Sequence, residues 1–514
     1  MADGSASGRG ATAGPLEQPS TDELLDAALS RAAELGAGHA EVRVEHIHSQ
    51  MVALRDATLE TAVDDAELGL GIRVVRGGSI GFAATAELTT DAAAQAAGQA
   101  VAMAEATAPT LAGPVVLAEE KPAGVVRWSS DYEIDPTEIA VGDKVAVLGN
   151  WSERLLGADG IDHVSAYVLC VVEDKVFGDL SGARITQRRV RVHPVVEAYA
   201  VDTDRGTFES MRTVAPPVGR GWEYLGGTGW DWDAELAAIP ELLAEKMRAP
   251  SVEAGAYDLV IEPSNLWLTI HESIGHATEL DRALGYEAAY AGTSFATFDK
   301  LGTLEYGSPV MHVTGDRVAQ HGLASVGYDD EGVAAQRFDI VRDGVLVGYQ
   351  LDRTMAAANG LGRSNGCAFA DSPFHIPIQR MANVSLQPAD GEGPGTDELV
   401  SGVDRGVLVV GDKSWSIDMQ RHNFQFTGQR FFRIERGRLA GQLRDVAYQS
   451  RTTDFWGSME AVGGRSTYVL GGAFNCGKGQ PSQVAPVSHG CPSALFRSVN
   501  VLNARAEAGV DNRS

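Results

Sequence analysis

Two histidines five positions apart, His271 and His276, constrain the fold of this chain more than any other feature. Residues four apart on an α-helix lie about 40° apart round its axis, whereas residues five apart lie about 140° apart. The two imidazoles can therefore face one metal ion only if the helix contains an extra residue in a π-type turn, or if it ends near Gly275. A shared metal ion thus predicts a distorted helix at this point.

The residue types around the two histidines are typical of a zinc peptidase. Glu272 follows the first histidine, so its carboxylate is expected beside the metal without binding it, as a general base requires. A catalytic zinc needs three protein ligands and one open position. On residue chemistry alone the third ligand is Glu279, Cys476 or Cys491, and a purely structural role for the histidines is the alternative.

Length and charge restrict the classes of protein to consider. With 514 residues, of which 44% are hydrophobic, the chain exceeds what one core usually organises, so two domains are expected. The formal net charge of -27 argues against a surface for nucleic acid or anionic membrane. The chain has no stretch of about 18 apolar residues, residues 1–21 lack a signal-peptide pattern, and four cysteines are too few for a disulfide framework. A cytoplasmic protein is expected.

Hydrophobic periodicity divides the chain into two parts. The first part predicts helices at 20–35, 90–105, 136–156 and 230–247, and strands at 40–44, 68–75, 80–82, 164–172 and 190–201. Periodicity is lost at 248–256. We therefore predict an α+β fold with a disordered segment at 1–20, an N-terminal mixed α/β domain at 21–248, and a β-rich C-terminal domain at 249–514 that contains the distorted His-Glu helix.

The second part is rich in glycine, and its pattern predicts β-strands for most of its length. Segments 338–348 and 432–441 both read as β-hairpins that turn at a glycine, because glycine accepts the positive φ that such turns need. A short helix is expected at 353–358. Acidic, Pro-rich and Gly-rich residues at 388–396 predict an exposed loop.

Several segments, in order along nearly the whole chain, resemble the TldD half of the TldD/PmbA (TldD/TldE) zinc metallopeptidase family. They are residues 40–45, 68–74, 81–83, 271–276 with 279, 328–332, 344–349 and 475–478. The resemblance implies zinc held by His271, His276 and Cys476, with Glu272 as the base. It also implies that the C-terminal domain is the metallopeptidase domain, and that the N-terminal domain handles substrate and partner by holding the substrate as an extended strand.

The same resemblance bears on assembly and substrate. The PmbA/TldE type lacks the His-Glu-His motif, so this chain is expected to be the catalytic member of a heterodimer, with a homodimer as the alternative. Such a dimer encloses the metal site and admits short, unfolded or modified peptides. Two segments depart from or lie outside the family pattern: residues 273–274 are Ser-Ile where well-known members have Ala-Val, and the family pattern assigns no role to His489 or Cys491.

Two other functions remain open on the sequence. A dipeptidyl peptidase III-like exopeptidase also places two histidines five apart around a glutamate, but its third ligand is a glutamate on a second, acidic helix, and no clearly matching helix follows here. The other alternative is a non-catalytic interaction subunit with a structural His-Glu segment. No residue of the sequence is assigned to stabilise an oxyanion.

Overall fold

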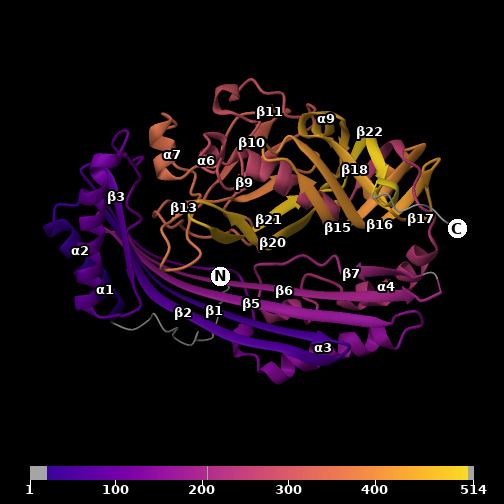
Figure 1. Ribbon diagram of the computed structural model, residues 1–514, viewed down its shortest axis with the longest axis horizontal. Helices are drawn as coiled ribbons and strands as arrows, with labels where there is room; N and C mark the ends of the chain where they lie inside the picture. The colour runs from indigo at the N-terminus through magenta and orange to yellow at the C-terminus, as the bar shows by residue number, and fades with distance from the viewer. Residues whose placement is uncertain (1–19, 205, 508–514) are drawn as a thin grey trace, which may run out of the picture.

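The structure is a computed structural model that describes residues 20–204 and 206–507. The segment 1–20, expected to be disordered, lies outside the described residues except for Ser20, with which the first helix begins. Figure 1 shows two layers: long strands of the N-terminal half cross the lower side of the molecule, and the C-terminal half lies above them. In the part of the chain that is described, no helix is both long and apolar enough to cross a membrane.

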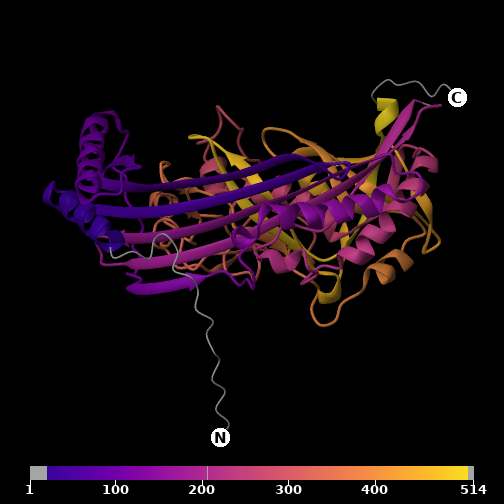
Figure 2. The same ribbon diagram turned by 90° about the horizontal axis from the view of Figure 1, so that it is seen from below.

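The N-terminal half is built on one seven-stranded sheet with the order β3-β2-β1-β5-β6-β4, and β7 pairs with β6. Its strands are β1 (His39–Arg55), β2 (Thr58–Arg76), β3 (Ser79–Thr85), β4 (Val125–Ser129), β5 (His163–Asp179), β6 (Arg184–Asp202) and β7 (Thr207–Arg212). Seen from below, the long strands run side by side across the molecule (Figure 2). Helices α1 (Ser20–Glu34) and α2 (Thr90–Thr107) cover one end of the sheet, and α3 (Val141–Leu156) and α4 (Trp232–Arg248) cover the other.

Alternation along β1 explains why one face of this sheet carries helices and the other faces the C-terminal half. Val42 and Val44 point into the core under α1 and α2. Glu41, Arg43 and Glu45 point to the opposite face, because successive side chains of a strand alternate. These charged residues are nonetheless buried. The C-terminal half therefore covers them.

Buried ion pairs join the two halves at Asp330 and Glu331. Asp330 Oδ1 accepts from Lys175 Nζ at 2.5 Å, and Asp330 Oδ2 lies 3.4 Å from Arg43 Nη1. The next residue, Glu331, accepts from Arg73 Nη2 at 2.7 Å. Charges this deeply buried are tolerated when each has a partner. These pairs hold the N-terminal sheet against the C-terminal half.

The C-terminal half contains a second seven-stranded sheet with the order β15-β8-β22-β18-β16-β17, and β15 also pairs with β16. Its strands are β8 (Gly255–Ile261), β15 (Arg405–Ile417), β16 (Asn423–Glu435), β17 (Arg438–Leu443), β18 (Val446–Arg451), β19 (Met459–Val462) and β22 (Ala494–Asn503). A four-stranded sheet contains β9 (Val313–Asp316), β10 (Arg337–Arg342), β11 (Val345–Leu346) and β14 (Asn383–Leu386). Two further pairs are β12 (Ala368–Phe369) with β13 (Ile378–Gln379), and β20 (Val469–Lys478) with β21 (Gln483–Cys491).

Short helices connect these strands: α5 (Pro263–Ile270), α6 (Leu280–Ala283), α7 (Arg353–Ala358), α8 (Thr396–Ser401), α9 (Thr452–Gly457) and α10 (Ala504–Glu507). Both predicted hairpins are present. Their turns are Asp343-Gly344 and Arg436-Gly437, in which both central residues have positive φ. That geometry matches the twist of the flanking strands. The expected loop at 388–396 leads into α8.

One predicted helix is wrong at its start. Residues 136–156 were expected to be continuous, but α3 begins at Val141 and residues 136–138 form a single 3₁₀ turn. Asp135 caps that turn by accepting the N–H of Thr137 at 2.8 Å. The chain is then extended at Ile139 and Ala140, so the helix must restart. The mixed α and β content and the strand-rich C-terminal half agree with the predicted fold class.

Candidate metal centre

The His-Glu segment departs from a regular helix where the spacing of its histidines requires it. Helix α5 ends at Ile270, a π-turn follows at His271–Gly275, and a 3₁₀ turn follows at His276–Thr278. The N–H of His276 donates to the carbonyl of His271, which closes the wider turn. The extra residue places the two imidazole rings with centroids 4.7 Å apart.

Gly275 serves close packing rather than backbone freedom, which differs from the reason expected from the sequence. Its φ of -51° is helical and open to any residue. A Cβ atom at this position would lie 2.5 Å from Met381 Sδ and 3.5 Å from His489 Cε1. The π-turn is therefore pressed against neighbouring side chains where it carries the histidines.

Strand β20 brings Cys476 to the two histidines. Its Sγ lies 3.5 Å from His276 Nε2, and one donor atom from each of His271, His276 and Cys476 falls within 4.8 Å of the others. The pairing of β20 with β21 shifts between Ala473 and Cys476. Such an irregularity re-aims side chains along a strand.

The structure places the other two candidate ligands outside this cluster. Glu279 Oε2 lies 2.9 Å from His276 Nδ1, on the side of the ring opposite Cys476. Cys491 is buried, and its Sγ lies 3.8 Å from the carbonyl oxygen of Pro263. Cys170 and Cys367 are also buried free thiols, and both lie outside the cluster.

Hydrogen bonds fix which ring nitrogen of each histidine is free. His489 Nδ1 lies 2.8 Å from the carbonyl oxygen of Val384, which can only accept, so His489 carries its proton on Nδ1. Its Nε2 then accepts from Nδ1 of His271 at 2.7 Å. Likewise, His276 Nδ1 donates to Glu279. Both histidines of the cluster therefore keep the lone pair of Nε2 for a metal.

Burial sets the protonation of these groups. It lowers the pKa of His271 and of His276 well below 6.5, so both imidazoles are neutral at neutral pH. Burial alone would raise the pKa of Glu279, but Lys478 and His276 hold it well below 4.5. Burial raises the pKa of the Cys476 thiol to about 11. A metal would have to displace one proton, from the thiol.

Glu272 lies beside the cluster without belonging to it. Its carboxylate accepts from Arg421 Nη1, and burial raises its pKa above 4.5 despite that cation. A buried carboxylate with a raised pKa is a stronger proton acceptor than an exposed one. The position and basicity of Glu272 fit the role expected of it.

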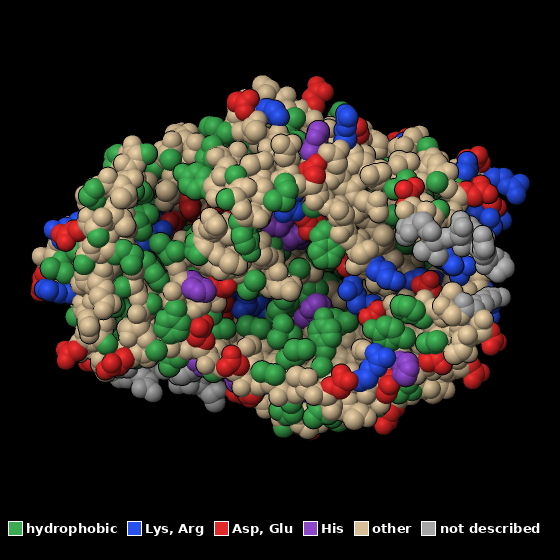
Figure 3. All heavy atoms as spheres, viewed as in Figure 1, with side chains coloured by type: hydrophobic (Ala, Val, Ile, Leu, Met, Phe, Trp, Pro, Cys, Tyr) green, Lys and Arg blue, Asp and Glu red, His purple; other side chains and the backbone are tan. Residues whose placement is uncertain are grey.

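The cluster opens into a cavity of about 630 Å³ between the two halves. Tyr167, His193 and Arg212 line it from the N-terminal sheet, and Trp267 and Trp415 line it from the C-terminal half. Figure 3 shows this hollow near the centre of the molecule, with histidine and basic side chains inside. One edge of β20 lines the same cavity through residues 469 and 471–477.

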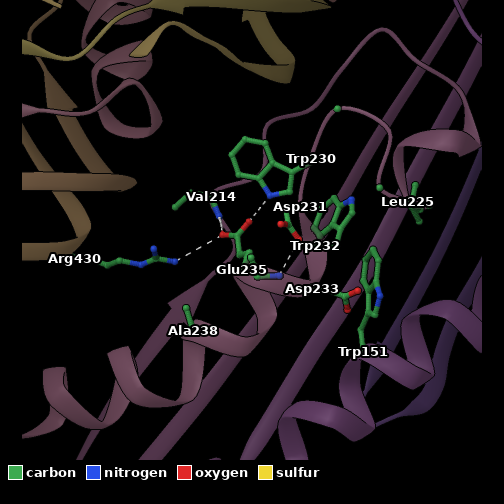
Figure 4. Close-up of a pocket in the computed structure, with 14 residues that line it drawn as sticks. Trp151, Val214, Leu225, Trp230, Asp231, Trp232, Asp233, Glu235, Ala238 and Arg430 are labelled. Carbon is green, nitrogen blue, oxygen red and sulfur yellow. Dashed lines mark hydrogen bonds and ion pairs between the residues drawn. The ribbon is translucent and has the colours of Figure 1, made fainter. Parts of the chain in front are cut away.

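A second hollow, of about 890 Å³, lies between α3, α4 and β16 (Figure 4). Its buried acid, Glu235, accepts the N–H of Val214 at 2.5 Å and Nε1–H of Trp230 at 2.6 Å, and lies 3.7 Å from Arg430. No histidine or cysteine is among the described residues that line it. It therefore offers no donor set like that of the metal cluster.

Three contributors were not identified from the sequence. His489 orients His271, Lys478 holds Glu279, and Arg421 contacts Glu272. Only Lys478 carried a signal, since it belongs to the Cys-Gly-Lys segment used for the family resemblance. The other two lie 218 and 149 positions from the residues they contact, so only the tertiary fold brings them to the site.

Comparison with known proteins places the chain in a class and then in a family. The class is that of two-part proteins with a metallopeptidase C-terminal domain: the profile described as "PmbA/TldA metallopeptidase C-terminal domain" matches residues 254–503, and "PmbA/TldA metallopeptidase domain 1" matches residues 40–104. The chain belongs to the TldD/PmbA family.

Relatives with curated names agree with this assignment. A "Metalloprotease" of Methanothermobacter thermautotrophicus is 27% identical over 472 residues, covering 90% of this chain and 95% of its own. A "Metalloprotease TldD homolog" of Haemophilus influenzae is 22% identical, covering 87% and 89%. A "Zinc metalloprotease TldD homolog" of Saccharolobus solfataricus is 24% identical over 273 residues, covering 53% and 57%.

Solved structures share the fold. TldE from Thermococcus kodakarensis superposes with a TM-score of 0.69 at 15% identity, covering 93% of this chain and 99% of its own. A Thermotoga maritima protein described as a proposed modulator of a DNA gyrase has a TM-score of 0.74 at 15% identity, covering 94% and 100%. At these identities the likeness concerns the fold alone.

Proposed function

We propose that the chain is a zinc-dependent peptidase that hydrolyses short, unfolded or modified peptides, with zinc held by His271, His276 and Cys476. The observation that carries this proposal is the cluster itself: two neutral imidazoles with free Nε2 atoms and one thiol, all within 4.8 Å. Two nitrogens and one sulfur are a donor set that suits zinc. Zinc bound there supplies a Lewis acid that polarises a peptide carbonyl and acidifies water.

The protein's own groups account for the proton transfers. Glu272 takes a proton from the attacking water as the new C–O bond forms, and later gives it to the leaving nitrogen as the C–N bond breaks. His489 and Glu279 hold the two imidazoles in the tautomers that leave Nε2 free. The volume of the cavity between the two halves, about 630 Å³, lies in the range of small-ligand pockets and suits a short stretch of peptide.

The proposed third ligand separates this function from a dipeptidyl peptidase III-like one. In that alternative a glutamate completes the ligand set, and Glu279 is the nearest candidate. Here Glu279 Oε1 is bound by Lys478 at 3.1 Å, and its Oε2 lies on His276 Nδ1. Both oxygens are thereby committed, so we assign the third position to Cys476.

We also propose that the chain is the catalytic subunit of a dimer with a PmbA/TldE-like protein, in the cytoplasm. The likeness of its fold to TldE supports such pairing, because two chains of one fold can meet in a pseudo-symmetric dimer. Co-purification with such a partner, followed by assay of an unstructured peptide with and without the partner, tests the pairing. Equal rates of cleavage would contradict it.

The four cysteines of the chain are unpaired, which fits the proposed reducing compartment. We place the division between the two proposed domains at 248/249, where α4 ends.

The Glu272→Gln variant tests the proposed chemistry. Glutamine keeps the shape of the side chain but cannot take a proton, so peptide hydrolysis is expected to fall at least ~100-fold while the metal stays bound. Glu235→Gln is the matched control, because Glu235 is also a buried acid with a raised pKa but lies in the other hollow. If Glu272→Gln cleaves as fast as Glu235→Gln, Glu272 is not the base.

A further inference from the structure

Arg421 is the cation that touches the proposed base. Its Nη1 donates to Glu272 Oε2, and the side chain is 13% exposed. It lines the same cavity as the two histidines and Cys476. A second arginine of this cavity, Arg212, is bound to Asp412 at 2.8 Å. The two guanidiniums therefore differ in what they face: a structural acid for Arg212, the reacting groups for Arg421.

The turn that carries Arg421 is held in an unusual backbone conformation. Arg421 has φ of +63°, in the left-handed region that costs free energy for any residue except glycine. Asp418 pins the turn by accepting the N–H groups of Gln420 and His422 at 3.0 and 2.9 Å. The carbonyl of Arg421 accepts from Thr452 Oγ1 at 2.7 Å. Asp343 and Arg436 adopt a similar conformation in hairpin turns, so the positive φ belongs to the turn, and the contacts with Asp418 and Thr452 are what hold Arg421 at the site.

Most of the hydrogen-bonding capacity of Arg421 is unused within the described chain. A guanidinium has five N–H groups. Nη1 donates to Glu272, Nε is buried and so cannot be reached by a substrate, and Nη2 makes no hydrogen bond to the described residues. A desolvated cation with spare donors stabilises negative charge more strongly than an exposed one does. The side chain is thus equipped to bind a second anionic oxygen beside Glu272.

We infer that Arg421 stabilises the oxyanion of the scissile peptide, an inference that rests on the proposed peptidase function. When the water oxygen bonds to the carbonyl carbon, the carbonyl π electrons move to its oxygen and the water proton moves to Glu272. Negative charge leaves Glu272 as it appears on the substrate oxygen. Arg421, already bonded to Glu272, then pairs with the oxyanion until the C–N bond breaks and the carbonyl re-forms. The cation is needed most in the transition state, so it lowers the barrier rather than only tightening binding.

The test compares Arg421→Ala, Arg421→Lys and the control Arg212→Ala in the metal-loaded chain. One probe is a short unstructured peptide that the wild-type chain cleaves; the other is the same peptide with a phosphinate in place of the scissile amide. Arg421→Ala should lower kcat about 100-fold, with KM changed less than about three-fold, since removal of one oxyanion donor costs this much. Arg421→Lys should fall between Arg421→Ala and the wild type, because lysine keeps the charge but lacks the planar fork.

Binding of the phosphinate gives a readout other than turnover. Its tetrahedral anion imitates the charge on the substrate oxygen, so its Kd, measured by calorimetry, should rise by a similar factor in Arg421→Ala. In Arg212→Ala, any loss of affinity for the phosphinate should be matched by an equal rise in KM for the peptide, because Arg212 does not face the reacting groups. Zinc content, measured in every variant, should stay that of the wild type.

Three outcomes would overturn the inference. An increase in KM with kcat unchanged would make Arg421 an anchor for a carboxylate of the substrate, and loss of zinc would make it structural. Unchanged kcat and unchanged phosphinate affinity would leave it no role in catalysis. If the wild-type chain binds no zinc and cleaves no peptide, the proposed function itself is wrong; if the wild type is active and Arg421→Ala is equally active, only the inference about Arg421 is wrong.

Discussion

His489 Nε2 lies 2.7 Å from His271 Nδ1, and this contact turns the other nitrogen of His271 toward Cys476 and His276. His489 is itself fixed, because its Nδ1 donates to the carbonyl of Val384. Burial lowers the pKa of His489 to about 4, so it stays a neutral acceptor at physiological pH. A residue outside the family motif thus sets the tautomer of a proposed ligand.

Replacing His489 should weaken metal binding without removing a ligand. In His489→Ala, zinc affinity is expected to fall about 10–100-fold, since partners that orient ligating histidines have effects of this size. Competition with a chelator of known affinity measures the change. His193→Gln is the matched control: His193 is half-buried and lines the same cavity, but it stacks on Phe474 and touches neither histidine of the cluster. Equal zinc affinity in His489→Ala and wild type would refute the orienting role.

Two glycines of β20 should respond differently to alanine. A Cβ at Gly472 would lie 2.3 Å from the carbonyl oxygen of Val487, an atom of the paired strand, whereas nothing lies within 4 Å of a Cβ at Gly477. Gly472→Ala must push β20 from β21 and is expected to cost about 1–3 kcal/mol of stability and to loosen zinc. Gly477→Ala should keep both. Thermal unfolding and zinc content, measured for both variants, test this difference. Equal stability and equal zinc content in Gly472→Ala and Gly477→Ala would contradict the packing argument.

The buried ion pair between the halves should contribute more to stability than an exposed one. Asp330→Asn leaves Glu45 as the remaining carboxylate shared by Lys175 and Arg43, at an expected cost of about 1–3 kcal/mol for the lost buried charged contacts. Asp339→Asn, which breaks an exposed pair with Arg342, should cost less than about 1 kcal/mol. Calorimetric unfolding measures both. A loss for Asp330→Asn no larger than for Asp339→Asn would mean that the halves do not depend on this contact.

Asp352 should make the chain less stable as pH rises through neutrality. Burial, with the nearby Glu331, raises the pKa of Asp352 from 3.8 to about 7. The folded state then holds a proton that the unfolded state loses above pH ~4, so this stabilising effect is complete below pH ~4 and is lost as pH rises to about 7. Asp352→Asn can still cap α7, where Asp352 accepts the N–H of Met355. Between pH 5 and 8 the free energy of unfolding should fall by on the order of 2 kcal/mol less in the variant than in wild type. Parallel plots of this free energy against pH for the two proteins would contradict the raised pKa of Asp352.

Periodic patterns in the sequence predicted most elements of the fold, because each element buries a regular set of apolar residues. The helix predicted at 136–156 was wrong at its start, because Asp135 accepts the N–H of Thr137 and this capping contact competes with the helix. The lengths of the strands were also underestimated. Strand β1 continues to Arg55 because its far end packs under α3 through Val52 and Leu54.

The candidate site was predictable only in part. The spacing of His271 and His276 demanded a distorted helix, because that follows from local geometry. Cys476 lies 200 positions from His276, so residue chemistry alone could not rank it above Glu279 or Cys491. The family resemblance supplied that choice. Arg421 carried no signal, since it reaches Glu272 only when the turn between β15 and β16 is placed over the π-turn.

The most direct test of the proposed site is the zinc content, by mass spectrometry, of chain purified without chelator, in wild type, Cys476→Ser and Cys491→Ser. The account predicts about one zinc per chain in wild type and in Cys491→Ser, whose thiol lies outside the cluster, and little in Cys476→Ser. Full zinc occupancy in Cys476→Ser, or none in the wild type, would contradict a site built from His271, His276 and Cys476.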